Sequence, residues 1–390
     1  MLDLARLRAD TPACRDLIHF NNAGAALMPD AVYHAQADHL ALERRLGGYE
    51  AARQAAPQLA AFYREFAALL NCDPSEIAYT ESATRAWDMA FYALPLKPGD
   101  RILTHATEYV SNYLAFLHQA KRRGLYIDVV SSDPTGQIDT QALDAMVTPA
   151  HKLIAITHVP SQSGLVNPAA AVGKVACKHN LTYLLDACQS VGQVAIDVAE
   201  IGCHILSGTG RKFLRGPRGT GFLYVSNSIV DTLDPPFIDL TAAQWTDDQT
   251  YTLAPGAKRF ENWESNVAGR IGLTVAVAYA RAIGMDAIQA RTATLAQMLR
   301  DALATVPGVT LRDQGQQKCG IVTFTKDGVS PDTIYVALRA GNINVSVTPL
   351  TYARLDLGPR GLAGVVRASV HYYNDADEVD RFIAALHRIG

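Results

Sequence analysis

Residues 182–225 read TYLLDACQSVGQVAIDVAEIGCHILSGTGRKFLRGPRGTGFLYV, and this stretch decides the fold. It holds three short apolar segments that are typical of strands buried on both faces of a sheet: Thr182 to Asp186, Ile205 to Ser207 and Gly221 to Val225. Outward from it, strand-like and helix-period segments alternate from about Pro57 to Val225, as a parallel sheet with crossover helices requires. We therefore predict a three-layer α/β domain with a mostly parallel sheet.

The same alternation assigns a type to each remaining segment of this domain. Further strands are expected at Ile77 to Thr80 and, again apolar enough to be buried on both faces, at Arg101 to His105, Ile127 to Ser131 and Leu153 to His158. Helices are expected at Pro57 to Leu70, Ala83 to Leu94, Ser111 to Arg123, Thr140 to Met146 and Asn167 to His179.

The pattern changes after Pro235-Pro236, where a polar stretch runs to Gly256 and a long helical run follows from about Asn266 to Thr305. Mixed elements come next: a strand at Ile321 to Thr325, a helix at Pro331 to Arg339, a strand at Val365 to Val370 and a last helix with Asn374 as its N-cap. We therefore predict a large domain over residues 21–256 and a smaller α+β C-terminal domain over 257–390. An N-terminal segment, residues 1–20, should pack with the small domain.

Composition excludes several classes of protein. A chain of 390 residues that is 49% hydrophobic and 19% charged has a large packed core, not the composition of a disordered protein. The net charge of −3 and the lack of a basic block argue against nucleic-acid binding. No apolar stretch approaches the roughly 18 to 20 residues that span a bilayer, so we expect no membrane partner and a cytoplasmic location. Six scattered cysteines without a Cys-x-x-Cys pair indicate neither disulfides nor a zinc site.

Two candidate functional residues follow predicted strands. Asp186 ends an apolar strand, where it either points toward a ligand crevice or caps the next helix. Lys212 follows the next strand and is flanked by glycines, which let a ligand approach the backbone closely, so it is well placed to form a Schiff base. A Walker phosphate loop is excluded because Arg211 precedes the lysine and Phe213 follows it.

A third feature is the segment Tyr79-Thr80-Glu81-Ser82-Ala83-Thr84, which lies between a predicted strand and a predicted helix. Free amides at a helix N-terminus bind phosphate, although Ser82 and Thr84 taken alone are more typical of plain N-caps. Pyridoxal phosphate needs a phosphate site, an acid for its ring nitrogen and a lysine for its aldehyde. The three features together therefore predict this cofactor.

These residues also carry a family resemblance. The quoted motifs are Asp186-x-x-Gln189, Ser207-x-Thr209-x-Arg211-Lys212 and Gly216-Pro217-x-Gly219-x-Gly221. They resemble the signature of the class V aminotransferase family, in the cysteine desulfurase-like branch of pyridoxal phosphate fold type I. The resemblance extends from Asn21-Asn22-Ala23-Gly24 to Arg367-Ala368-Ser369 and Tyr373-Asn374, which is most of the chain.

The resemblance implies roles for the residues already named. Lys212 would bind the cofactor aldehyde and then move a proton between Cα and C4′, and Asp186 would pair with the ring nitrogen. Gln189 would donate to the phenolic oxygen. The phosphate would be bound by Ser82, Ala83, Thr84 and Thr209.

Two positions depart from the family pattern. Tyr109 stands where related desulfurases have a histidine that stacks on the ring, so the aromatic face is kept and the imidazole is lost. Arg211 stands where those relatives usually have histidine, and it adds cationic charge near the phosphate. Ser161 lies in a strand-end loop that lines the cofactor pocket in relatives, whereas His158 fits a structural role equally well.

Substrate contacts are expected from other segments. Arg367 lies within an apolar strand, and a buried guanidinium needs a carboxylate, either from an internal acid or from the substrate. The resemblance favours the substrate α-carboxylate and also places Asn22 at the substrate side. It further implies a homodimer in which residues near Glu264 to Asn266 approach the phosphate site of the partner.

The reaction type is predicted from a missing residue. Cysteine desulfurases carry a nucleophilic cysteine shortly before the carboxylate-binding arginine, but residues 342–364 contain no cysteine, and Cys319 fits a core position. We therefore predict a carbon-sulfur lyase that releases pyruvate and ammonia from a cysteine-derived amino acid by β-elimination. An aminotransferase, a racemase or a catalytically silent homologue remain alternatives. The loop from Ser346 to Arg360 is expected to shape the substrate side.

Overall fold

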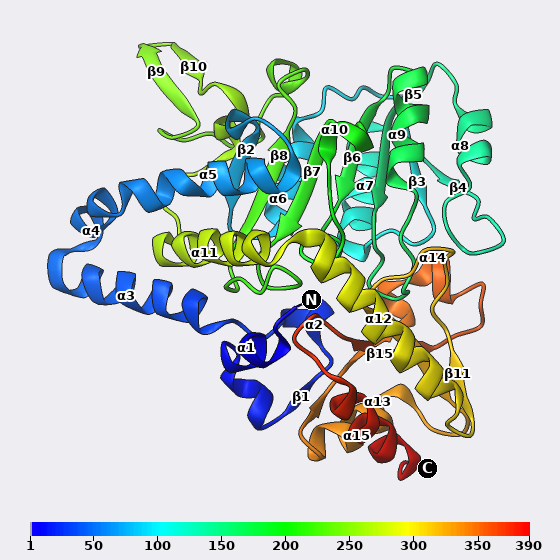
Figure 1. Ribbon diagram of the computed structural model, residues 1–390. Coiled ribbons are helices and arrows are strands. Elements are labelled where there is room, and N and C mark those ends of the chain that lie inside the picture. The colour runs from blue at the N-terminus through cyan, green and yellow to red at the C-terminus, as the bar shows by residue number, and fades with distance from the viewer. Residues whose placement is uncertain (1) are drawn as a thin grey trace.

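A computed structural model describes residues 2–390, and its larger part is built on one seven-stranded sheet (Figure 1). The sheet has the order β2-β8-β7-β6-β5-β3-β4, and only β8 runs against its neighbours. The strands are β2 (Ile77–Thr80), β3 (Arg101–His105), β4 (Tyr126–Val130), β5 (His151–Thr157), β6 (Thr182–Asp186), β7 (Ile205–Thr209) and β8 (Gly221–Val225). The predicted α/β fold with a mostly parallel sheet is confirmed.

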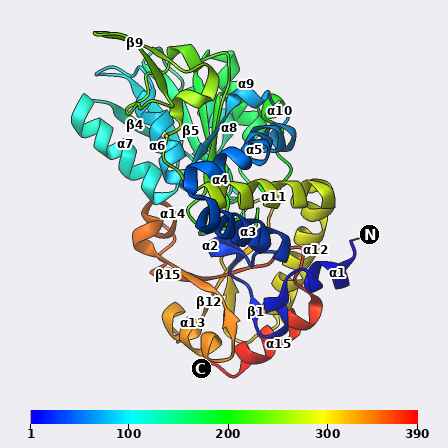
Figure 2. The same ribbon diagram turned by 90° about the vertical axis from the view of Figure 1, so that its left-hand side faces the viewer.

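Helices bury both faces of this sheet (Figure 2). One face packs against α5 (Ala56–Leu70), α8 (Thr140–Met146), α9 (Ala169–Lys178) and α10 (Val198–Ile201). The other face packs against α6 (Ala83–Ala93) and α7 (Val110–Arg123). The edge strand β4 is an exception, because Tyr126 is 55% exposed. The prediction that every strand is buried on both faces is therefore wrong at β4, which has a neighbour on one side only.

The long helical run predicted over 266–305 is two helices, α11 (Val267–Ile283) and α12 (Met285–Ala304), bent by 81°. The break falls at Gly284, the C-cap of α11. Its φ of +95° is accessible to glycine and departs from helical geometry, so α11 ends there. Leu273 and Val277 of α11 belong to the core of the large sheet, so the proposed boundary at 256/257 stays a prediction. No single helix in residues 2–390 is long and apolar enough to span a bilayer; α11 and α12 meet that test only jointly.

The smaller part of the molecule has a four-stranded antiparallel sheet. Its order is β11 (Val309–Leu311), β12 (Ile321–Lys326), β15 (Gly364–Ser369) and β14 (Ser346–Pro349). Residues of α12, α13 (Pro331–Ala340) and α15 (Ala376–His387) share one core with it. The N-cap of α15 is Asp375, one residue after the predicted Asn374, because the Asp375 carboxylate accepts the Glu378 N–H at 2.9 Å.

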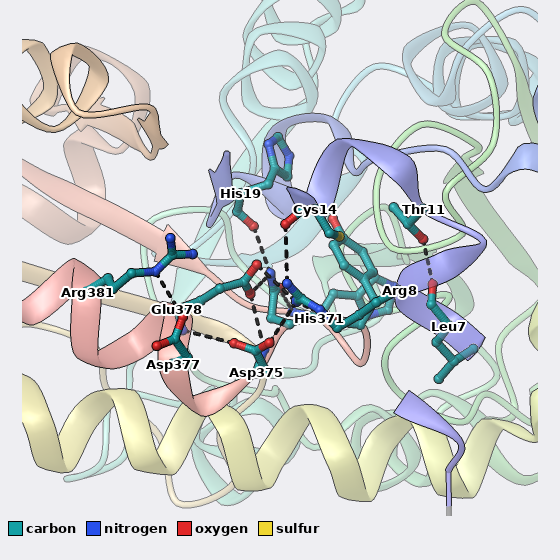
Figure 3. A network of polar contacts seen from close by, with 12 residues as sticks. Leu7, Arg8, Thr11, Cys14, His19, His371, Asp375, Asp377, Glu378 and Arg381 are labelled. Atoms are coloured by element: carbon teal, nitrogen blue, oxygen red, sulfur yellow. Dashed lines mark hydrogen bonds and ion pairs between the residues drawn. The ribbon is translucent and has the colours of Figure 1, made fainter. Parts of the chain in front are cut away.

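The N-terminal segment lies against this smaller part (Figure 3). Strand β1 (Ile18–His19) pairs in parallel with β13 (Ile343–Asn344). Arg8, at the end of α1 (Leu4–Ala9), pairs with Asp375 at 3.1 Å and with the buried Glu378 at 3.0 Å. Ion pairs at the start of α15 therefore connect the N-terminal segment to the last helix of the chain.

Some elements lie outside the predicted pattern. Among them are the helices α2 (Asn22–Ala25), α3 (Asp30–Leu46), α4 (Gly48–Gln54) and α14 (Arg354–Leu357), and a hairpin of β9 (Ala243–Asp247) and β10 (Thr250–Leu253). The hairpin lies in the stretch between Pro236 and Gly256, for which the sequence predicts only a polar segment. Most of its side chains are exposed, in agreement with that polar composition.

Candidate active site

One cavity lies at the edge of the large sheet where β2, β5, β6 and β7 end. It is lined by Ser82, Ala83, Thr84, Tyr109, Asn112, Thr157, Ser161, Asp186, Cys188, Gln189, Thr209, Arg211 and Lys212. Every residue predicted to hold the cofactor is in this set. Asn112, Thr157 and Cys188 are additional. Thr157 ends a strand at the same edge as Asp186, which is the sequence signal that could have identified it.

Two hydrogen bonds fix the Asp186 side chain at the cavity. Its side chain is buried, its Oδ1 accepts the backbone N–H of Cys188 at 2.8 Å, and its Oδ2 accepts the side-chain amide of Asn112 at 2.8 Å. The carboxylate therefore closes the short turn after β6 and also lines the cavity. The alternative that Asp186 caps the next helix is wrong, because the N-cap of α10 is Asp197.

Lys212 enters the cavity without a partner. Its side chain is buried, and within residues 2–390 its ammonium forms neither a hydrogen bond nor an ion pair. Burial lowers the pKa of Lys212, and the nearby guanidinium of Arg211 lowers it further. Its Nζ lies 6.0 Å from the centre of the Tyr109 ring. A buried amine with a lowered pKa is more often uncharged, which is the form that reacts with an aldehyde.

The start of α6 forms another wall of the cavity. Ser82 is the N-cap, and its Oγ accepts the N–H of Arg85 at 3.1 Å, so the capping role is confirmed for this serine. The first amides of the helix have no intrahelical partner and suit an anion. A Cβ on Gly221 would lie 2.7 Å from the carbonyl carbon of Ser82, so a glycine at the start of β8 is what lets the helix start approach the sheet this closely. Thr209 lies at the end of β7 on the same side.

Gln189 and Ser161 share a hydrogen bond across the cavity. The Gln189 amide donates to Ser161 Oγ at 2.9 Å and to the carbonyl of Ala23 at 3.1 Å, while its Oε1 is buried without a partner. Both amide hydrogens of Gln189 are thus in use. The hydroxyl hydrogen of Ser161 is free and is the better placed donor for an acceptor in the cavity.

Two arginines lie beside this cavity. Arg211 donates to the carbonyl of Gly24. Arg367, on β15 of the smaller sheet, is 8% exposed and forms two long bonds of 3.4 Å, to Ser161 O and Asn21 Oδ1. Within residues 2–390 it has no carboxylate partner, and its Nε is buried without any partner. Burial and the charge of Arg211 lower the pKa of Arg367 to about 10.

Two further candidates are not among the residues that line the cavity. Asn22 is fully buried, and its side chain bonds Ser369 O at 2.8 Å and also the Tyr373 hydroxyl. Asn22 therefore does not line the cavity. Its side-chain hydrogen bonds join the N-terminal segment to the smaller sheet. His158 is also buried, and burial lowers its pKa to about 4, which describes a neutral structural histidine.

The chain belongs to the aminotransferase class V family, whose model matches residues 18–382. Probable cysteine desulfurases are among its relatives. The protein of that name from Xylella fastidiosa (strain 9a5c) is 32% identical, and the match covers 99% of this chain and 95% of the relative. A second, from Methanothermobacter thermautotrophicus, is 27% identical over 96% of this chain and 94% of its own length.

Solved structures agree with this assignment. The apo cysteine desulfurase from Thermococcus onnurineus NA1 has a TM-score of 0.92 and 26% identity, covering 99% of this chain and 98% of the other. The cystine C-S lyase C-DES has a TM-score of 0.89 at 22% identity, over 97% of this chain and 100% of its own, and supports the fold. The predictions of the family, the fold and an enzyme of the cysteine desulfurase-like branch are confirmed.

Proposed function

We propose that this chain is a pyridoxal phosphate enzyme that breaks the Cβ–S bond of cysteine or a cysteine-derived amino acid by β-elimination. The observation that carries the proposal is the meeting of Lys212, Asp186 and the start of α6 around one cavity. The names of the relatives, cysteine desulfurases, support the choice of substrate.

The unpartnered groups of the cavity fit this cofactor. Lys212 has no partner and suits the aldehyde, while the amides at the start of α6 suit the phosphate. Asp186 suits a protonated ring nitrogen, and the free hydroxyl hydrogen of Ser161 suits the phenolic oxygen. When bound, the cofactor supplies an electron-accepting ring that stabilises negative charge at the substrate Cα. A fold relative, a mutant form of C-DES, holds glycine covalently linked to this cofactor.

The residues of the chain bind the substrate and move its proton. The Arg367 guanidinium holds the substrate α-carboxylate, because it is buried and has no internal carboxylate. Lys212, which burial favours as the neutral amine, removes the proton from Cα. Asp186 keeps the ring nitrogen protonated. The Tyr109 ring covers one side of the cavity.

The cysteines of the chain do not supply a nucleophile for sulfur. Cys188 lines the cavity, but burial raises the pKa of its thiol to about 12, so it is protonated at neutral pH. Cys319 is buried in an apolar cluster, and burial raises its pKa to about 11. Residues 342–364, which form β13, β14 and α14, contain no cysteine. We therefore propose that sulfur leaves with its bonding electrons and is released, without forming a protein persulfide.

The test is product analysis with cysteine or an S-substituted cysteine and no keto acid. One Cβ–S bond breaks, the sulfur leaves as hydrogen sulfide from cysteine or as a thiol from an S-substituted cysteine, and the remaining enamine hydrolyses to pyruvate and ammonia. We expect pyruvate, ammonia and the sulfur product in equal amounts, and no sulfur bound to the protein. The Cys319→Ala variant is the matched control, and its rate should stay within about twofold of the wild-type rate.

Other products would contradict the lyase. Alanine together with protein-bound sulfur would show transfer to a thiol of the chain. Amino-group transfer to an added keto acid, without pyruvate in its absence, would instead show the alternative, an aminotransferase.

We also propose a homodimer, formed through the face that carries α3, α4 and residues 261–266. Large apolar side chains are exposed there: Leu40 is 55%, Tyr49 61% and Trp263 55% exposed. A groove between them is lined by Glu264 to Asn266, the residues that the resemblance places at the phosphate site of the partner. Burial of such a patch in an interface is what its size and composition favour.

Sedimentation should therefore give a mass of about twice 42.1 kDa. The Trp263→Glu variant should shift the protein toward the monomer, because it would bury an unpaired charge in the interface. The control is Leu114→Glu, a change at a residue that is 59% exposed on α7. A wild-type protein that sediments as a monomer at micromolar concentration would refute the dimer. A cytoplasmic location is a further proposal, supported by six cysteines that are all free thiols.

A further inference from the structure

A second buried carboxylate lies directly behind Asp186. Glu108 is 6% exposed and does not line the cavity. The single side-chain nitrogen of Asn112 donates to Glu108 Oε1 at 2.9 Å and to Asp186 Oδ2 at 2.8 Å. One amide group therefore joins the two carboxylates, and both of its hydrogens are used.

Several hydrogen-bond donors surround the Glu108 carboxylate. Its Oε1 also accepts the backbone N–H of Tyr109 at 2.8 Å and the hydroxyl of Thr157 at 2.5 Å. Its Oε2 accepts the hydroxyl of Thr104 at 3.3 Å. These donors come from β3, β5 and the start of α7, so the position of Glu108 is fixed by three elements of the large domain.

The orientation of Asn112 follows from this arrangement. Glu108 Oε1 accepts three hydrogen bonds, from Asn112, Tyr109 and Thr157, so Asn112 turns its NH₂ group toward it. The same NH₂ group then reaches Asp186. Without the carboxylate of Glu108, the amide could rotate by half a turn and present its oxygen to Asp186, which would repel it.

Asp186 is the ionisable group whose charge acts on Glu108. Two nearby histidines, His105 and His158, have pKa values that burial lowers to about 4. Both histidines are therefore uncharged at neutral pH. Burial raises the pKa of Glu108 to about 7, and the charge of Asp186 adds to the rise. Asp186 is the charged group that Glu108 meets.

We propose that Glu108 is a positioning residue for the cofactor: through Asn112 it fixes the Asp186 carboxylate at the ring-nitrogen site. This inference rests on the proposed cofactor. Above a pH of about 7, where Glu108 is ionised, its charge also favours retention of a proton on the ring nitrogen.

The test compares cofactor binding by Glu108→Gln, Asn112→Ala and the double variant. We expect each single variant to weaken the dissociation constant for pyridoxal phosphate by about tenfold, since hydrogen bonds to charged groups are affected. The double variant should lie within about threefold of Asn112→Ala, because both changes act through one amide. The pH dependence of the visible band of the bound cofactor should also shift in Glu108→Gln.

The matched control is Glu378→Gln. Glu378 is equally buried and accepts the Asn374 side-chain amide at 2.8 Å, but it lies in the smaller part of the molecule (Figure 3). This variant should lose thermal stability and keep wild-type cofactor affinity and the wild-type pH dependence of the band. If Glu108→Gln does not fold, Asn112→Ser tests the same link.

Two outcomes would overturn the inference. If Glu108→Gln lowers the melting temperature as Glu378→Gln does, but keeps cofactor affinity within about twofold and the band unchanged, Glu108 is a core residue only. If wild-type protein takes up no pyridoxal phosphate, the proposed function fails, and the inference fails with it.

Discussion

Replacement of Lys212 by alanine is expected to lower the rate of pyruvate formation from cysteine by about 10⁴-fold, because a positioned general base contributes up to this factor. The residue is buried, lines the cavity and has no partner among residues 2–390, so its amine has no structural contact to lose. A coupled pyruvate assay measures the rate. The variant should fold, since removal of a buried unpaired amine leaves no partner unsatisfied.

The stability of the cofactor-free protein gives a second readout. The pKa of Lys212 is lowered from 10.5 in the folded state, so between the lowered value and 10.5 the unfolded chain binds more protons. Stability should therefore rise with pH in that window, and the rise should be smaller in Lys212→Ala.

The control is Lys178→Ala, at an exposed lysine that pairs with Asp144 at 2.7 Å. It should retain the wild-type rate. A Lys212→Ala variant that keeps more than a tenth of the wild-type rate would exclude Lys212 as the base and require another group for the proton at Cα.

The sequence predicts the cavity well because strand ends are local signals. The apolar runs that end at Asp186 and Thr209 fix which residues emerge at one edge, and the glycines around Lys212 mark close backbone approach. Asn112 was missed because its link to Asp186 joins residues 74 positions apart, and only the packing of α7 on the sheet brings them together. Periodicity cannot encode such a contact.

Other errors have equally specific causes. The helical periodicity continues through Gly284, so the bend between α11 and α12 is visible only in the positive φ of that glycine. The exposure of β4 depends on its place at the end of the strand order, which composition does not report. The role of Asn22 at the substrate stays a prediction, whereas its hydrogen bonds to the smaller sheet are long-range and have no local signature.

Replacement of Arg367 by leucine is expected to have opposite effects on activity and stability. The guanidinium is buried, and its only hydrogen bonds in residues 2–390 are the two of 3.4 Å. Because a buried unpaired charge is destabilising, the leucine variant should gain about 1–2 kcal/mol in the free energy of unfolding without substrate. Loss of the carboxylate contact should raise KM for cysteine by about 100-fold, the effect of a charge-assisted pair.

Arg300→Leu is the matched control for the stability effect. Arg300 is 4% exposed, but it pairs with Asp313 at 2.5 Å, so its removal leaves this buried carboxylate with only the longer contact to Lys318 at 4.0 Å and should destabilise the fold by about 3–5 kcal/mol. Thermal unfolding of both variants and steady-state kinetics of Arg367→Leu distinguish the two situations. A loss of stability in Arg367→Leu comparable to that in Arg300→Leu, with an unchanged KM, would mean that Arg367 serves the fold. The opposite signs are expected because the partner of Arg300 belongs to the chain, whereas the partner of Arg367 arrives with the substrate.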